Sequence, residues 1–167
     1  STLSGKTAKA RRHRKIWLVS GILLAAFLIF NLIWFLNYRS YGTVSGDYER
    51  YNGMYVKEDS REFDYTWSGP DYPSFNGNYA ITNADDTLSL IIWPKSLFRE
   101  ESRFGLQMYD DVWKEGYMFY VDRDMNYSDA ENPEFSEREK EKILDWMEKR
   151  DAEIRQLKEL AEAEWKI

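Results

Sequence analysis

An uninterrupted apolar run near the N-terminus constrains this chain more than any other feature. Residues 16–36 read IWLVSGILLAAFLIFNLIWFL and carry no charged side chain. At a rise of about 1.5 Å per residue, an α-helix of this length matches a hydrocarbon core of about 30 Å. The run therefore predicts one transmembrane helix at residues 16–36.

The residues on either side of this run indicate its orientation. Residues 1–15 carry basic side chains and no acidic one, and positive charge beside a span favours retention in the cytoplasm. We therefore expect a basic cytoplasmic tail over residues 1–15 and an extracytoplasmic C-terminal domain at a cell membrane. The alternative location is the mitochondrial inner membrane, to which the same charge rule applies; the C-terminal domain would then lie in the intermembrane space. The rival to an uncleaved signal anchor is a cleaved signal peptide, but its apolar core is shorter and ends at small residues.

Five side chains of the run have properties that suit a membrane helix. Trp17 and Trp34 lie near its two ends, where indole rings favour the headgroup region. Gly21 and Ala25 form a pair of small residues that allows close helix approach, and the Asn31 amide can hydrogen-bond across a helix interface. We predict that these residues contact lipid headgroups or a neighbouring membrane helix.

The chain after the run is strongly acidic. It holds all 29 Asp and Glu residues but only 17 of the 23 Lys and Arg residues, which gives it a net charge of −12. Because nucleic acids and anionic lipid surfaces recruit basic patches, we expect no nucleic-acid partner. The charge leaves two interpretations open, namely a cationic partner or ion and a surface that only keeps the domain soluble.

Short segments rich in β-branched and aromatic residues follow a predicted linker at residues 37–50. They predict an antiparallel β-rich domain over residues 51–132 with five or six short strands. The segments are residues 53–58, 62–67, 78–82, 87–93, 103–109 and 116–122. The Asn-Ala-Asp-Asp sequence at residues 83–86 favours a hairpin with a short loop.

Residues 133–167 predict one long amphipathic helix. Pro133 ends the preceding chain, and Ser136 with Glu139 forms a capping pattern. No Gly or Pro follows, so the helix is expected to continue unbroken for about 45 Å. The predicted fold is therefore a single transmembrane helix plus a small α+β domain, in which an antiparallel sheet precedes a long C-terminal helix.

The apolar residues of this helix fall into two groups on either side of a charged middle at residues 148–153. One interpretation is that one group packs on the sheet and the other reaches a partner. The other interpretation is a single helix that packs on its own domain and has a solvated midsection.

The residue types exclude several familiar catalytic designs. His13 is the only histidine and lies on the predicted inner side of the membrane, so it cannot serve a serine nucleophile in the outer domain. The chain has no cysteine, which also excludes the usual zinc sites. Two facing carboxylates remain possible for a hydrolase, but nothing in the sequence selects a pair. We therefore expect a non-enzymatic protein with no cofactor.

One acidic segment approaches the pattern of a calcium loop. Asp122, Asp124, Asn126 and Ser128 match the first four ligand positions. The match then fails, because the sixth position is Tyr127 rather than Gly and the twelfth is a proline rather than Glu. Weak calcium binding and a polar loop with turn hydrogen bonds are the two interpretations.

Large apolar side chains supply the candidate partner-binding residues. Aromatic residues crowd a stretch with Gly and Pro, and the helix end adds further apolar positions; the candidates are Trp67, Tyr72, Leu157, Leu160 and Trp165. Aromatic rings suit interfaces. The alternative is that they fill the core of a small domain.

Together these features favour a single-pass membrane-anchored accessory protein, or subunit of a membrane complex, that binds another membrane or envelope protein. The first alternative is a membrane-tethered ligand-binding or sensor domain for a cation, a glycan or an envelope polymer. A carboxylate-dependent hydrolase is the third hypothesis.

Overall fold

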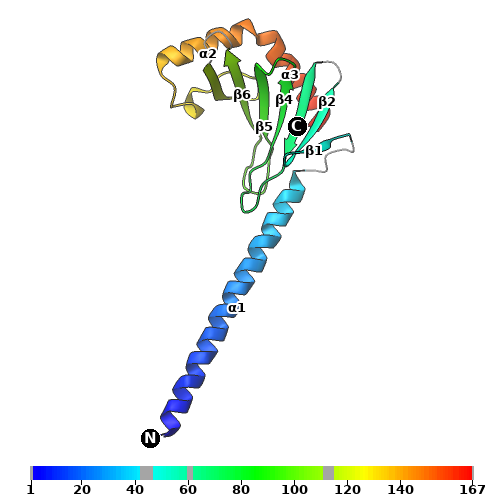
Figure 1. Cartoon of the computed structure of the whole chain (residues 1–167). Coiled ribbons are helices and arrows are strands. Elements are labelled where there is room, and N and C mark those ends of the chain that lie inside the picture. Colours follow the sequence, from blue (N-terminus) through cyan, green and yellow to red (C-terminus); the bar gives the residue numbers. More distant parts are fainter. Residues whose placement is uncertain (1, 42–46, 60–61, 111–114, 167) are drawn as a thin grey trace.

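A long N-terminal helix leads into an α+β domain in the computed structural model of the chain (Figure 1). The structure describes residues 2–41, 47–59, 62–110 and 115–166. Helix α1 (Thr2–Ser40) contains the apolar run, and within it residues 13–39 form a segment long and apolar enough for a membrane anchor or a signal sequence. None of the residues in the most apolar 18-residue window of this segment is buried.

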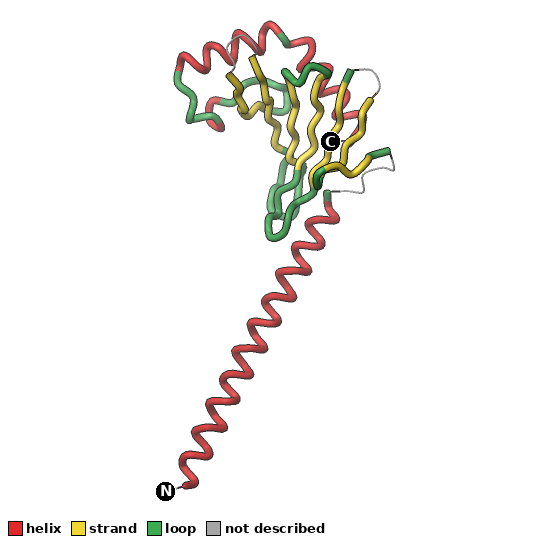
Figure 2. The backbone as a smooth tube through the Cα atoms, in the orientation of Figure 1, coloured by secondary structure: helices red, strands yellow, loops and turns green. Residues whose placement is uncertain are grey.

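The domain contains one seven-stranded sheet in which every neighbouring pair is antiparallel. The strands are β1 (Glu49–Tyr51), β2 (Met54–Asp59), β3 (Phe63–Ser68), β4 (Asn78–Asn83), β5 (Leu88–Trp93), β6 (Arg103–Asp110) and β7 (Glu115–Val121). Their order in the sheet is their order in the sequence (Figure 2). The six segments predicted from the sequence correspond to β2 to β7, and the β4–β5 hairpin has the predicted short loop.

Strand β1 lies at the end of the segment predicted as a linker. It forms an antiparallel hairpin with β2. The two residues of the turn, Asn52 and Gly53, have φ angles of 46° and 87°. Two central residues with positive φ are the requirement of a type I′ hairpin turn, for which Asn-Gly is the preferred sequence. At the other end of that segment α1 continues to Ser40, so the predicted linker at residues 37–50 includes helical and strand residues as well as residues 42–46, which lie outside the described part.

One face of the sheet forms the core. In β5 the side chains of Leu88, Leu90 and Ile92 are fully buried, whereas the residues between them are partly exposed. This alternation follows from the period of two residues in a strand. Leu90 is opposite Ile81 on one neighbouring strand and Leu106 on the other, so the buried residues form continuous rows across the sheet. The C-terminal helices pack on these rows.

The prediction of a single long helix over residues 133–167 is wrong in one respect, because this segment contains two helices. Helix α2 (Glu137–Lys149) begins at the predicted capping box, and α3 (Asp151–Trp165) follows a break at Arg150. Strands of six to eight residues are only about 20–27 Å long, so a straight helix of 45 Å would extend beyond the sheet. The break lets both halves contribute to one core, to which Ile143 and Leu157 belong.

Hydrogen bonds to the β4–β5 hairpin hold this bend in place. The Arg150 guanidinium donates to Glu153 at 2.6 and 2.7 Å and to the Thr87 hydroxyl at 2.9 Å. Glu153 also accepts a bond of 2.8 Å from the amide of the buried Asn83. The charged middle of the predicted helix is therefore the segment that fixes the bend to this hairpin.

Candidate functional site

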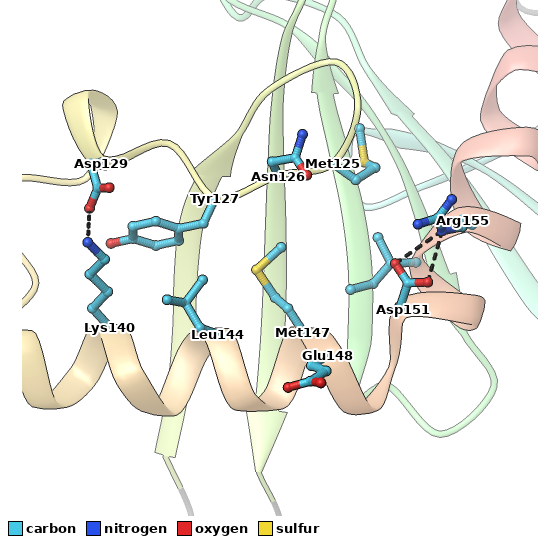
Figure 3. Close-up of a pocket in the computed structure, with 11 residues that line it drawn as sticks. Met125, Asn126, Tyr127, Asp129, Lys140, Leu144, Met147, Glu148, Asp151 and Arg155 are labelled. Carbon is cyan, nitrogen blue, oxygen red and sulfur yellow. Dashed lines mark hydrogen bonds and ion pairs between the residues drawn. The ribbon is translucent and has the colours of Figure 1, made fainter.

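The bend between α2 and α3 forms one side of an open groove, and the loop after β7 forms the other (Figure 3). The groove has a volume of about 620 Å³. Its lining residues come from the loop and from both helices: Met125, Asn126, Tyr127, Asp129, Lys140, Leu144, Met147, Glu148, Asp151, Ile154 and Arg155. We call this feature the elbow groove.

The loop wall of the elbow groove is held by apolar and amide side chains. Met125 has a φ of 65° and is buried, and the Tyr127 ring lies 5.8 Å from the Phe119 ring of the core. Farther along, the buried Asn132 bonds to β7, where its amide donates to the Tyr120 carbonyl at 2.8 Å and accepts from the Tyr120 N–H at 2.7 Å. These contacts give the groove a fixed shape.

Two ion pairs stand at opposite ends of the elbow groove, and apolar side chains lie between them (Figure 3). Lys140 pairs with Asp129 at one end, and the Arg155 Nε lies 2.9 Å from the Asp151 Oδ2 at the other. Between them Leu144 is 42% exposed. An accessible apolar centre with a polar rim is the usual composition of a protein-binding surface.

The four candidate calcium ligands lie in the hairpin at the edge of this groove. Asp122 uses its carboxylate inside the loop, where Oδ1 accepts the N–H groups of Asp124 and Asn126 at 2.8 Å. The Asn126 side chain adds a bond to Oδ2 at 3.0 Å, and these bonds lower the pKa of the Asp122 carboxyl.

Asp124 lies 3.8 Å from the Lys158 ammonium, and the Ser128 N–H donates to the Tyr120 carbonyl. Within the described ranges no group of three or more His, Cys, Asp or Glu residues could hold a metal ion. The Asp122 carboxylate forms the turn hydrogen bonds expected of a polar loop, and calcium binding by these four residues stays a prediction.

A second candidate site is the junction between α1 and the sheet domain. Asn37 and Tyr41 are 0% and 1% exposed, and both donate hydrogen bonds of 2.9 Å to the Phe75 carbonyl in the β3–β4 loop. One turn earlier, the Trp34 indole donates to the Ser74 carbonyl at 2.7 Å. The last two turns of α1 are therefore hydrogen-bonded to backbone carbonyls of this loop.

Aromatic rings pack around these hydrogen bonds. The Phe30 ring lies 5.5 Å from Phe75 and 6.0 Å from Tyr72, both with edge contacts. The Tyr38 ring makes an edge contact with the buried Trp67 at 6.3 Å. A Cβ at Gly69 would lie 2.8 Å from the Tyr38 ring, so a larger residue there would displace this ring. Together with the polar contacts, we call these residues the α1 junction.

Tyr79 connects the α1 junction to the C-terminal helix. Its hydroxyl donates to the carbonyl of Tyr41 at the end of α1, and its ring stacks on Trp165 at 4.9 Å. Burial raises the pKa of Tyr79 to about 12. Beside it, the Trp165 indole donates to the Tyr48 hydroxyl at 3.1 Å. The ends of α1 and α3 thus meet at one tyrosine.

The structure separates the predicted partner-binding residues. Leu157 and Trp67 are buried in the domain's own core, and Leu160 and Trp165 pack against that core. Tyr72 is exposed but belongs to the α1 junction. Both halves of the C-terminal helical segment therefore pack on their own domain.

The predicted membrane residues lie along α1. Trp17, Gly21 and Ala25 are on its exposed surface, whereas Trp34 bonds to the β3–β4 loop. The Asn31 amide donates to the Phe27 carbonyl at 2.7 Å within the same helix.

Sequence reasoning missed both the elbow groove and the α1 junction. The helical spacing of Lys140, Leu144 and Met147 places them on one side of a helix, which was the available signal for the groove. For the junction, the signal was an asparagine, Asn37, directly after the apolar run.

Comparison of the chain with protein-family models, with curated proteins and with solved structures finds no match. The fold and the two sites define the class of protein only as an α+β domain that follows a long apolar helix.

Proposed function

We propose that this chain is a single-pass membrane-anchored accessory subunit that binds another membrane or envelope protein in its elbow groove. Helix α1 is the uncleaved anchor, residues 1–15 stay on the cytoplasmic side, and the acidic domain lies outside. The observation that carries the proposal is the α1 junction, in which Asn37 of the helix and Tyr41, the residue directly after it, are buried against the domain. A flexible tether would need no such contact.

The α1 junction also favours an anchor over a signal sequence. Cleavage beyond residue 41 would take both donors from the Phe75 carbonyl and would remove the Tyr38 ring from Trp67. A buried polar group that loses its partner costs about 1–3 kcal/mol. The mature domain is therefore more stable when the helix remains attached.

The position of the elbow groove suits a partner held above the membrane. Helix α2 lies at the end of the domain far from the N-terminus of α1 (Figure 1). With α1 fixed to the domain, the groove keeps one orientation relative to the bilayer. Its ion pairs and exposed Leu144 suit a partner segment with an apolar centre and charges of both signs.

Site-specific crosslinking in native membranes tests the proposal. Because the chain has no cysteine, Leu144→Cys in the full chain carries a photo-crosslinker at a single place, and Glu162→Cys on the exposed side of α3 is the matched control. We expect one discrete adduct from position 144 that is absent from position 162 and is lost when Lys140→Glu is added. Equal labelling at both positions, or none at 144, contradicts the groove as the binding site.

Retention of the N-terminal segment tests the anchor. We expect an epitope placed before residue 1 to remain on the membrane-bound protein after alkaline extraction, and to be accessible only from the cytoplasmic side. Loss of the epitope from the mature protein would show that α1 is a signal sequence.

A second candidate function is ligand binding by the same groove, because a volume of about 620 Å³ is within the range of small-molecule sites. Calorimetry with soluble envelope glycans tests it, and Arg155→Ala is the variant expected to reduce the glycan signal. Calorimetry with calcium tests the metal version, for which Asp122→Ala is the variant expected to reduce the signal. Asp129 and Asp151 are each paired with a basic residue, so they do not favour the carboxylate-dependent hydrolase.

A further inference from the structure

Two loops of the sheet extend beyond its edge beside the outer end of α1 (Figures 1 and 2). They join β3 to β4 at residues 69–77 and β5 to β6 at residues 94–102. Ring contacts connect both loops to the helix, because Phe30 of α1 lies 5.5 Å from Phe75, and Phe75 lies 4.7 Å from Phe98. The loops therefore lie alongside the apolar run and not only above it.

The tip of the β5–β6 loop has an unusual composition. Ser96 and Arg99 exchange backbone hydrogen bonds of 3.0 and 3.2 Å, which makes Leu97 and Phe98 the two central residues of a tight turn. Such positions are normally occupied by Gly, Asn, Asp, Pro or Ser. Here Leu97 is 59% exposed and Phe98 is 64% exposed. Two large apolar side chains are thus presented at the most protruding point of a surface loop.

The depth of the two loops follows from the contact between the β3–β4 loop and α1. Phe30 precedes Leu36, the outer end of the apolar run, by six residues, and six residues of helix are about 9 Å long. The β3–β4 loop, whose Phe75 contacts Phe30, therefore extends below the outer end of the run, and the β5–β6 tip contacts this loop through Phe98. Tyr72, exposed beside Trp34 at 5.4 Å, lies in the same layer.

Charged residues flank the tip on the side toward the domain. Lys95 is exposed, and the Arg99 guanidinium bonds to the Asn76 side chain at 3.1 Å. Basic groups at this height suit lipid phosphates, with their carbon stems along the apolar layer. Glu100 and Glu101 follow Arg99 in the sequence and are also exposed.

We propose that Leu97, Phe98 and Tyr72 insert into the outer leaflet beside α1, so that the domain contacts the bilayer through the helix and two loop tips. This inference depends on the proposed role of α1 as a membrane anchor. The occupant is lipid because the loop tips continue the exposed apolar surface of α1, whose side chains from residue 13 to residue 30 are all exposed.

Depth-dependent fluorescence quenching tests the insertion. The full chain is reconstituted in vesicles of phosphatidylcholine and phosphatidylglycerol, with an environment-sensitive dye on a single cysteine. Phe98→Cys reports on the tip, and Leu97→Cys does so while the contact between Phe75 and Phe98 is kept. Ala84→Cys in the exposed β4–β5 loop is the aqueous control, and Leu28→Cys on α1 is the membrane control.

We expect emission at shorter wavelength and strong quenching by lipids that carry a shallow spin label at positions 97 and 98. Position 28 should respond most to a deep label, and position 84 to neither. A tip that behaves like position 84 while position 28 is still quenched overturns the insertion and leaves the anchor standing. If position 28 is also unquenched, the anchor itself is wrong. Blue-shifted emission at the tip without lipid quenching would show that protein covers it and would also overturn the proposal.

Discussion

Helices α1 and α3 attach to the same domain in opposite ways. Helix α3 lies along the sheet and buries the apolar side of Ile154, Leu157 and Ala161 against β4 and β5. Helix α1 meets the domain with its end, where Asn37 and Tyr41 donate to a loop carbonyl. The first contact buries mainly aliphatic side chains, and the second combines hydrogen bonds of fixed geometry with contacts between aromatic rings.

The difference separates stability from orientation. Burial of a Leu or Ile side chain contributes about 1.5–3 kcal/mol, so the face of α3 is a large part of what keeps the domain folded. A hydrogen bond contributes about 0.5–1.5 kcal/mol net but has strict geometry. The hydrogen bonds of the α1 junction therefore contribute less to the stability of the fold than the buried face of α3 does, and they contribute more to the angle between helix and domain.

We expect the largest loss of stability from a substitution on the buried face of α3. Leu157→Ala should lower the free energy of unfolding by about 2–5 kcal/mol, since it leaves a cavity in the core. Chemical unfolding of the full chain in detergent, followed by tryptophan fluorescence, measures this. Leu144→Ala in the elbow groove removes the same atoms from a side chain that is 42% exposed and should have a much smaller effect. Similar losses for both variants would contradict the assignment of α3 as the core-forming helix.

The second prediction is that a variant of the α1 junction changes the angle between helix and domain without much change in the stability of the sheet. The double variant Asn37→Ala/Tyr41→Phe removes both donors from the Phe75 carbonyl, which should cost the junction about 1–3 kcal/mol. We expect a broader distribution of distances between spin labels at Leu28→Cys and Ala84→Cys, with little change in the unfolding of the sheet. Asn31→Ala is the control, because that amide bonds within α1. An unchanged distance distribution would mean that the junction does not set the angle.

Tyr79 contacts the ends of both α1 and α3. Loss of its hydroxyl should lower the free energy of unfolding by a smaller amount, and this amount should depend on pH. Tyr79→Phe keeps the stack on Trp165 but loses the hydrogen bond to Tyr41, at a cost of about 0.5–1.5 kcal/mol. Burial raises the pKa of Tyr79 to about 12, above an unfolded value of about 10. Its contribution is therefore complete below pH 10 and is lost as the pH rises toward 12.

Unfolding of the wild type and of Tyr79→Phe at a series of alkaline pH values tests this. The variant should have a shallower loss of stability above a pH of about 10, the ordinary pKa of tyrosine. A residual slope should remain, since burial also raises the pKa of Tyr48. Identical pH profiles would show that the Tyr79 hydroxyl is not buried in the folded chain.

The smallest stability effect is expected at the rim of the elbow groove. Arg155 and Asp151 form an exposed pair four residues apart, and such pairs contribute about 0.3–0.5 kcal/mol. Arg155→Ala should therefore unfold almost like the wild type and yet reduce the crosslinked adduct at position 144. A full adduct with Arg155→Ala would show that this ion pair takes no part in partner binding.

The sequence predicted those elements whose signals are local. The capping box of Ser136 and Glu139 forms as expected, and both of its hydrogen bonds are present. The β4–β5 hairpin follows from turn-forming residues between two apolar segments. Strand β1 was missed although Asn52-Gly53 is the preferred sequence for the turn beside it, because that pair stands at the end of a stretch without apolar alternation.

The features that could not be predicted depend on residues far apart in the chain. The bend at Arg150 is held by Thr87, 63 residues away, and residues 148–153 alone are compatible with one straight helix. Likewise, the role of Asn37 is apparent only with the Phe75 carbonyl, 38 residues later. The elbow groove requires both the bend and the loop of residues 122–129, so no local pattern contained it.

In the proposed membrane-anchored protein, the α1 junction makes the helix and the domain one rigid lever with its pivot in the bilayer. A helix whose apolar length exceeds the thickness of the hydrocarbon layer tilts, and the tilt changes when the layer becomes thinner or thicker. Because Asn37 and Tyr41 join the helix to the sheet, any change in tilt swings the domain through the same angle. If α1 is the anchor proposed above, lipid composition sets the direction in which the elbow groove points, and a partner at a fixed height would meet the groove in membranes of one thickness more readily than in others.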